Sequence, residues 1–202
     1  ARQHCLPAAD SAQVWIDFDG TLSRRDVLDD LIRTFSINES WKLIEEQWQA
    51  GLIGSRQCLE QQLALVKIDD EELNRYLDGV ELDPGALALL KLLKEFHVPV
   101  AVLSDGIDLF IKRILKNHGV MHLPVRSNTI ERQGDRMQVL CPHSNSACTS
   151  ASAHCKCMSA TALGRMGRGT IYIGDGRSDL CAARSADYVF AKNALARFFT
   201  QE

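Results

Sequence analysis

The chain has 202 residues, of which 46% are hydrophobic and 24% are charged, and a formal net charge of -3. These values are typical of a globular protein with one domain, or one domain with an inserted subdomain. No run of Lys and Arg suggests nucleic acid as a partner. No stretch approaches the roughly 18 consecutive apolar residues of a membrane-spanning helix. Because the sequence shows no secretory signal, we expect a cytoplasmic protein. No pattern in the sequence predicts an oligomeric state.

The first predicted strand, residues 14–16, runs directly into two aspartates, Asp17 and Asp19, which Gly20 and Thr21 follow. Two carboxylates brought close together repel each other, and they are costly to remove from water. A divalent cation relieves both costs, because hard cations take oxygen ligands. We therefore expect a Mg²⁺ site here, with an ordinary strand-turn and one helix-capping carboxylate as the alternative.

A helical segment of about 60 residues follows the aspartates and contains no convincing strand. The spacing of apolar residues predicts helices over 26–35, 40–48 and 55–66, and the acidic run 69–72 opens a fourth. This segment is an insertion between the first strand and the rest of the chain.

The remaining residues alternate between helices and apolar strands. Helices are predicted over 86–96, 107–117, 158–166, 178–183 and 193–199, and strands over 98–103, 125–129, 137–140, 170–173 and 188–190, with a hairpin turn at 132–136. Such alternation predicts an α/β fold with a doubly wound, Rossmann-like, mostly parallel sheet.

Polar side chains follow three of the predicted strands. Besides the first pair of aspartates, Ser104 follows the strand 98–103, and Asp175 and Asp179 follow the strand 170–173. Ligand sites in open α/β sheets lie beyond the carboxyl ends of the strands, so these groups are expected to converge there.

Together these segments resemble the four signature motifs of the haloacid dehalogenase-like (HAD) phosphatases. The motifs are Asp17-Phe-Asp-Gly-Thr21, Ser104 after its strand, Lys156, and Gly174-Asp-Gly-Arg-Ser-Asp179, in matching order and spacing. The insertion resembles the cap of the phosphoserine-phosphatase branch of that family. The resemblance implies a core domain, 1–23 and 84–202, and a helical cap, 24–83.

The resemblance also implies the catalytic and metal-binding residues. Asp17 would attack phosphorus to give an aspartyl-phosphate, Asp19 would act as general acid and then base, and Lys156 would neutralise the phosphoryl group. Mg²⁺ would be held by Asp17, by the main-chain carbonyl of Asp19 and by Asp175, with Asp179 behind them. For Asp179, capping of the next helix is the alternative.

The substrate-binding residues implied by the resemblance are Ser104, Asp105 and Gly106 for the phosphate and Asp26 for the leaving group. Ser104 and Asp26 have an alternative as helix caps. The arginines Arg24, Arg25 and Arg56 are possible substrate contacts, although no motif includes them, and exposed charge is the better interpretation of all three.

The cysteine-rich stretch that leads into Lys156 stands apart from these motifs. It contains four of the seven cysteines, Cys141, Cys148, Cys155 and Cys157, together with His143. These side chains are candidates for zinc, a disulfide or free thiols, and their spacing does not match a paired zinc motif.

The expected function is Mg²⁺-dependent hydrolysis of a small phosphorylated metabolite. Pro142-His-Ser144 and the cysteines resemble the methionine-salvage subfamily, which acts on an enol phosphate. The alternatives are a phosphoserine or broad-specificity phosphatase, and a degenerate HAD fold kept as a binding or regulatory module.

Overall fold

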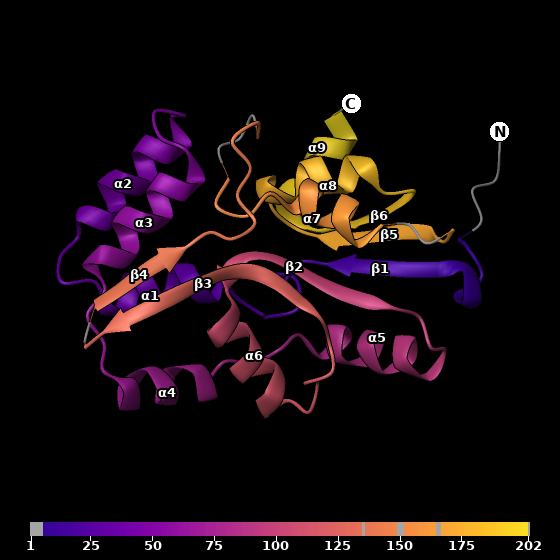
Figure 1. Ribbon diagram of the computed structural model, residues 1–202, viewed down its shortest axis with the longest axis horizontal. Coiled ribbons are helices and arrows are strands. Elements are labelled where there is room, and N and C mark those ends of the chain that lie inside the picture. Colours follow the sequence, from indigo (N-terminus) through magenta and orange to yellow (C-terminus); the bar gives the residue numbers. More distant parts are fainter. Residues whose placement is uncertain (1–5, 135, 149–151, 165–166, 202) are drawn as a thin grey trace.

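The computed structural model describes residues 6–134, 136–148, 152–164 and 167–201 (Figure 1). These residues form a six-stranded sheet in the order β4-β3-β2-β1-β5-β6. All neighbouring strands are parallel except β3 and β4, which form an antiparallel pair. The strands are β1 (Ala12–Ile16), β2 (Val100–Ile107), β3 (Val125–Gln133), β4 (Arg136–Leu140), β5 (Gly169–Gly174) and β6 (Tyr188–Ala191).

Helices lie on both faces of this sheet and beyond one end of it (Figure 1). The α-helices are α1 (Val27–Phe35), α2 (Ser40–Gln49), α3 (Ser55–Leu65), α4 (Asp70–Asp78), α5 (Pro84–Glu95), α6 (Asp108–Asn117), α7 (Lys156–Leu163), α8 (Leu180–Ser185) and α9 (Asn193–Gln201). Two short 3₁₀ helices, Ala9–Ser11 and Arg177–Asp179, precede β1 and α8. Among the described residues, no helix combines the length and apolar character needed to cross a membrane.

The central strand β1 is buried along its whole length because its side chains alternate between two hydrophobic clusters. Val14 and Ile16 belong to the cluster that includes residues of α5 and α6. Trp15 packs in the second cluster, with residues of α7, α8 and α9. The strand is therefore held from both faces, which fixes the position of the aspartates at its end.

The two connections between the sheet and the inserted helices α1 to α4 lie side by side. Ser23 and Leu82 form an antiparallel bridge, and the Asp83 amide donates to the Leu22 carbonyl at 2.8 Å. Beyond this neck, α2 packs against α3, α3 lies against β4, and α4 packs against α6. The β3–β4 hairpin thus extends the sheet as a support for the inserted helices (Figure 1).

The α/β fold, the parallel sheet and the hairpin are as predicted from the sequence, but several element boundaries differ. The strand β2 continues beyond Leu103 to Ile107 with a shift of register, so Ser104 lies within it. Helix α7 begins at Lys156 rather than at 158, and its predicted end at 166 lies outside the described residues. Asp135, in the predicted hairpin turn, is also outside them.

Candidate active site

The carboxyl ends of β1 and β5 bring three aspartates together. One carboxylate oxygen from each of Asp17, Asp175 and Asp179 lies within 4.8 Å of the others. Gly20 makes this approach possible, since its φ of +70° suits glycine and a Cβ there would lie 2.6 Å from the Asp175 carboxylate. Among the described residues, this cluster is the group that can hold a divalent cation through hard oxygen ligands.

Lys156, the first residue of α7, reaches this cluster with its ammonium group. Its Nζ lies 2.7 Å from Asp17 Oδ1 and 2.7 Å from Asp179 Oδ1, and all three side chains are buried. Burial alone would lower the pKa of Lys156, but the two carboxylates outweigh burial and hold this pKa well above its usual value. The lysine is therefore a fixed positive charge beside Asp17.

Asp179 supports the loop between β5 and α8. Its Oδ2 accepts the amide hydrogens of Asp175 and Gly176, each at 2.9 Å, and its Oδ1 accepts the Tyr172 hydroxyl at 2.7 Å. Its side chain makes no capping hydrogen bond to α8, but it accepts the Gly176 amide in a capping box of the preceding 3₁₀ helix, so the helix-cap alternative holds for that turn and not for α8. The sequence-based prediction that Asp179 sits behind Asp17 and Asp175 agrees with these contacts.

The side chain of Asp19 points away from the three-aspartate cluster, as expected if only its main-chain carbonyl binds metal. Oδ1 accepts the Val27 amide at 2.9 Å, and Oδ2 accepts the Ser104 hydroxyl at 3.3 Å. Burial, with a smaller contribution from the charge of Asp26, raises the pKa of Asp19 from 3.8 to about 8. At neutral pH this carboxyl group carries a proton that it can donate.

Ser104 is fully buried behind the wall of the cavity, where its hydroxyl also accepts the Gly106 amide at 2.8 Å. Ser104 therefore does not cap α6, whose N-cap residue is Ile107. Asp105 and Gly106 both line the cavity itself. Asp105 and Gly106 at the end of β2 therefore face the cavity, and the Ser104 hydroxyl behind them stabilises the conformation of this strand end.

A residue that the sequence-based reasoning missed, His154, fixes this strand end. Its amide donates to Asp105 Oδ1 at 2.9 Å, its Nδ1 lies 2.7 Å from the Ser104 carbonyl oxygen, and its Nε2 lies 2.6 Å from Ser159 Oγ. A ring nitrogen beside a carbonyl must donate, so Nδ1 carries the hydrogen and Nε2 accepts from the hydroxyl. Burial lowers the pKa of His154 from 6.5 to about 4, which keeps the ring neutral.

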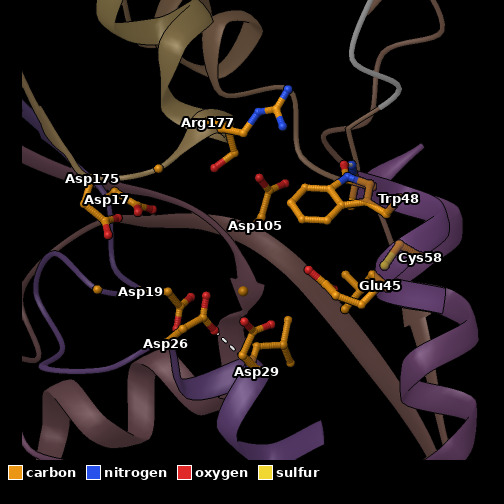
Figure 2. Close-up of a pocket in the computed structure, with 18 of the residues that line it drawn as sticks. Asp17, Asp19, Asp26, Asp29, Glu45, Trp48, Cys58, Asp105, Asp175 and Arg177 are labelled. Atoms are coloured by element: carbon orange, nitrogen blue, oxygen red, sulfur yellow. Dashed lines mark hydrogen bonds between the residues drawn. The ribbon is translucent and has the colours of Figure 1, made fainter. Parts of the chain in front are cut away.

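A cavity of about 460 Å³ opens over these groups (Figure 2). Its floor is formed by the strand-end residues, and its opposite wall comes from the inserted helices α1, α2 and α3. Figure 2 shows Asp29, Glu45 and Trp48 on that wall, across from Asp17 and Asp175. No sequence pattern indicated these wall residues, because their positions follow the helical pattern of an ordinary amphipathic surface.

Asp26 lines the same cavity, and it also caps α1 by accepting the Asp29 amide at 2.9 Å. The helix-cap interpretation of Asp26 is thus confirmed, whereas its predicted contact with substrate stays a prediction. The three arginines form ion pairs at the surface: Arg24 with Glu81 at 2.6 Å, Arg25 with Asp30 at 3.7 Å, and Arg56 with Glu60 at 2.8 Å.

The cysteine-rich stretch does not form a single cluster. Cys141 lies near Arg56 and Glu60 of α3, whereas Cys155 contacts Cys157, which also contacts Cys181 of α8, a partner that sequence spacing did not suggest. Cys5 lies outside the described residues. None of the six described cysteines forms a disulfide with another described cysteine, and Cys58, Cys141, Cys155, Cys157 and Cys181 are free thiols, one of the three predicted alternatives.

The geometry of this site, with aspartates at two strand ends, a buried lysine and a helical insertion, has a counterpart in known proteins. The sequence matches the family described as haloacid dehalogenase-like hydrolase over residues 14–184, which is most of the chain. The chain belongs to the haloacid dehalogenase-like hydrolases. The match runs from β1 into α8, so it includes Asp17, Lys156 and Asp179.

Named relatives of this HAD hydrolase share similar sequence and structure. It is 27% identical over 189 residues to 2-hydroxy-3-keto-5-methylthiopentenyl-1-phosphate phosphatase of Brevibacillus brevis, covering 91% of this chain and 83% of the relative. A substrate-bound phosphoserine phosphatase superposes with a TM-score of 0.72 at 19% identity, over 92% of this chain and 89% of the other. A HAD family hydrolase of Salmonella enterica serovar Typhi gives a TM-score of 0.72 at 22% identity, and the match covers 90% of this chain but 61% of that longer chain.

Proposed function

We propose that this HAD hydrolase is a phosphatase that hydrolyses a small phosphate monoester through an aspartyl-phosphate on Asp17. The observation that carries the proposal is the separation of two carboxyl groups at the end of β1. Asp17 lies 2.7 Å from the Lys156 ammonium, whereas Asp19 is held by Val27 and Ser104, with its pKa raised to about 8 by burial. Burial raises the pKa of both carboxyl groups, but Asp17 has the Lys156 ammonium in direct contact, which favours its ionised form, so the pair suits a nucleophile and a general acid.

In the first step, an Asp17 carboxylate oxygen attacks phosphorus and the bond from phosphorus to the ester oxygen breaks. Asp19 gives its proton to the departing oxygen, so the leaving group departs as an alcohol or enol. In the second step, Asp19 takes a proton from a water molecule that attacks the phosphorus of the aspartyl-phosphate, which releases phosphate and regenerates both carboxyl groups. The Lys156 charge stabilises the phosphoryl oxygens throughout.

The three-aspartate cluster fits a Mg²⁺ ion, because it offers carboxylate oxygens within 4.8 Å of one another at the floor of the cavity. We propose that Asp17, Asp175 and the main-chain carbonyl of Asp19 hold the ion and that Asp179 orients the loop behind them. When bound, Mg²⁺ would screen the charge between the phosphate dianion and the carboxylates.

The domain division follows from the same proposal. The neck at Ser23 and Leu82 supports a core of residues 1–23 and 84–202 with a cap of residues 24–83. The cap supplies the cavity wall opposite Asp17, so it contacts the part of the substrate that lies beyond the phosphate. Closing this wall over the phosphate would exclude bulk water from the first step.

The cap wall bears on the choice between the two candidate substrates. The residues of α1 to α3 that line the cavity are Leu28, Asp29, Glu45, Trp48, Ser55, Cys58, Leu59 and Gln62, and none of these carries a positive charge. Burial and the nearby charges of Asp26 and Glu45 raise the pKa of Asp29 to about 7. A serine leaving group carries an ammonium, which Asp29 and Glu45 could receive, and a carboxylate, which has no cationic partner on these three helices; the guanidinium groups that line the cavity, Arg24 and Arg177, lie outside them.

A neutral leaving group suits the wall better, because Trp48 and Leu59 offer apolar contact and Glu45 can accept a hydrogen bond from a hydroxyl. This favours the enol phosphate of methionine salvage, which the printed name of the Brevibacillus relative describes, over phosphoserine. The expected substrate is therefore a small phosphate ester whose leaving group is uncharged.

A panel of phosphorylated metabolites assayed for phosphate release with Mg²⁺ tests the proposal. We expect kcat/KM for 2-hydroxy-3-keto-5-methylthiopentenyl-1-phosphate to exceed that for phosphoserine by at least about 10²-fold. Preference for phosphoserine would overturn the substrate assignment. Absence of phosphate release from every ester of the panel, at full occupancy of Mg²⁺, would favour a binding module and overturn the enzymatic proposal.

A further inference from the structure

Three thiols gather at the start of α7, immediately beside Lys156. Cys155 and Cys157 flank the lysine in sequence, and Cys181 is the second residue of α8, which packs against α7. All three line a second cavity of about 510 Å³, as does Cys148, and Lys156 and Ser178 are among the residues that this cavity shares with the catalytic cavity. Small reactants that enter the second cavity therefore meet sulfur atoms directly beside the lysine.

The closest pair of thiols is Cys155 and Cys157. Their Sγ atoms lie 3.4 Å apart, and Cys157 also forms a side-chain hydrogen bond with Cys181. Cys155 is buried, with 2% of its surface exposed, whereas Cys157 is partly exposed to the second cavity. This pairing places one accessible sulfur in contact with one protected sulfur, so an oxidised Cys157 has a resolving thiol beside it. Burial raises the pKa of both thiols, so their reaction with peroxide is expected to become faster as the pH rises.

The backbone between the two cysteines carries the lysine of the active site. Cys155 is the N-cap residue of α7, Lys156 is its first residue and Cys157 is its second. The Lys156 ammonium makes 2.7 Å contacts with both Asp17 and Asp179, so a small change in this first turn alters two short contacts at once.

We propose that Cys155 and Cys157 are an oxidation site, where a hydroperoxide produces a reversible disulfide that disables Lys156. The Cys157 sulfur attacks the peroxide oxygen, and the O–O bond breaks to leave a sulfenic acid on Cys157 and an alcohol, or water from hydrogen peroxide. The Cys155 sulfur then attacks the Cys157 sulfur, forms the disulfide and releases one water molecule. A dithiol reductant restores both thiols by exchange.

The size of the effect follows from the sulfur separation. Bonded sulfur atoms lie about 2.0 Å apart, so the pair must close by more than an ångström from its 3.4 Å separation. The first turn of α7 has to adjust, and with it the lysine between the two cysteines. Misplacement of a catalytic group by about 1 Å costs on the order of 10²-fold, so we expect a 10- to 100-fold loss of phosphatase activity.

The test treats the whole protein with hydrogen peroxide and maps its disulfides by mass spectrometry of the unreduced peptides. We expect one peptide species that has lost two hydrogen atoms and contains a Cys155–Cys157 bond, together with the loss of activity and its recovery in dithiothreitol. The disulfide map does not depend on the proposed function, whereas the activity loss does. If the untreated protein has no phosphatase activity but peroxide still forms the expected disulfide, the proposed function alone is contradicted.

Matched serine variants separate this pair from its neighbours. Cys157→Ser should lose the disulfide and keep its activity in peroxide, whereas Cys181→Ser removes a thiol from the same cavity and should still form the bond. Cys141→Ser, near α3, is the distant control and should behave as the wild type. A Cys157–Cys181 bond in place of Cys155–Cys157, or unchanged thiols after peroxide treatment, would overturn the proposal.

Discussion

Acid should weaken the fold through His154, which joins the Ser104 strand end to the start of α7. Burial lowers the pKa of this ring from 6.5 to about 4, while the unfolded chain keeps the ordinary value. Between these two values the unfolded state binds more protons than the folded state, so stability falls as the pH falls. Proton linkage lowers the free energy of unfolding by about 3 kcal/mol once the pH is below both pKa values. About 2 kcal/mol of this is lost between about pH 7 and pH 5.

Urea unfolding curves at closely spaced pH values measure this loss, with His154→Gln as the matched variant. Glutamine can still donate to the Ser104 carbonyl, but it does not titrate. The comparison matters because Asp19 and Asp29, whose pKa values are raised to about 8 and about 7, titrate in the same range with the opposite sign and stabilise the fold as the pH falls. The same dependence of unfolding free energy on pH in both proteins would refute the role assigned to His154.

Three further predictions concern the charged groups of the site. Asp19→Asn should lower kcat by about 10²- to 10⁴-fold, because no side chain then donates a proton to the leaving oxygen. A near-normal kcat with nitrophenyl phosphate, whose leaving group needs no proton, would support this cause. EDTA should abolish phosphate release and Mg²⁺ should restore it; activity that survives exhaustive chelation would contradict the metal assignment. Lys156→Met should lower the unfolding free energy by about 3–5 kcal/mol in urea titrations, since Asp17 and Asp179 stay buried without their cation, and unchanged stability would argue against the buried ion pairs.

Much of the site follows from local sequence patterns because its residues sit at the ends of strands. An apolar run such as 14–16 indicates a buried strand, and parallel strands deliver the side chains that follow them to one edge of the sheet. Asp17 and Asp175 could therefore be placed together although a large part of the chain separates them. The insertion was also visible, because four helical patterns interrupt the alternation of helices and strands.

The cap wall could not be predicted because it depends on how the inserted helices are oriented over the sheet. Glu45 and Trp48 lie on a helix with few buried residues, and nothing in their spacing distinguishes a cavity wall from a solvated face. Asp29 is similar, since an acidic residue in the first turn of a helix is common. Their shared role as the wall opposite Asp17 emerges only from tertiary packing.

The contacts around Lys156 were missed for a related reason. His154 and Tyr172 act through single hydrogen bonds to a carbonyl and a carboxylate, and such bonds leave no periodic pattern in a sequence. Cys181 joins Cys157 through the packing of α8 on α7, whereas Cys141 lies near Arg56 and Glu60 of α3. Proximity in sequence indicated Cys155 and Cys157 correctly, but it could not separate Cys141 from them or add Cys181.

The central claim is that Asp17 forms a covalent bond to phosphorus. Beryllofluoride with Mg²⁺ mimics a phosphoryl group on a carboxylate, so fluorine NMR and a crystal structure of the treated protein test the claim directly. We expect beryllium bonded to a carboxylate oxygen of Asp17, within reach of the Lys156 ammonium, and no such signal from Asp17→Asn. An adduct on another residue such as Asp175, or no adduct on an enzyme that hydrolyses its substrate under the same conditions, would contradict the account.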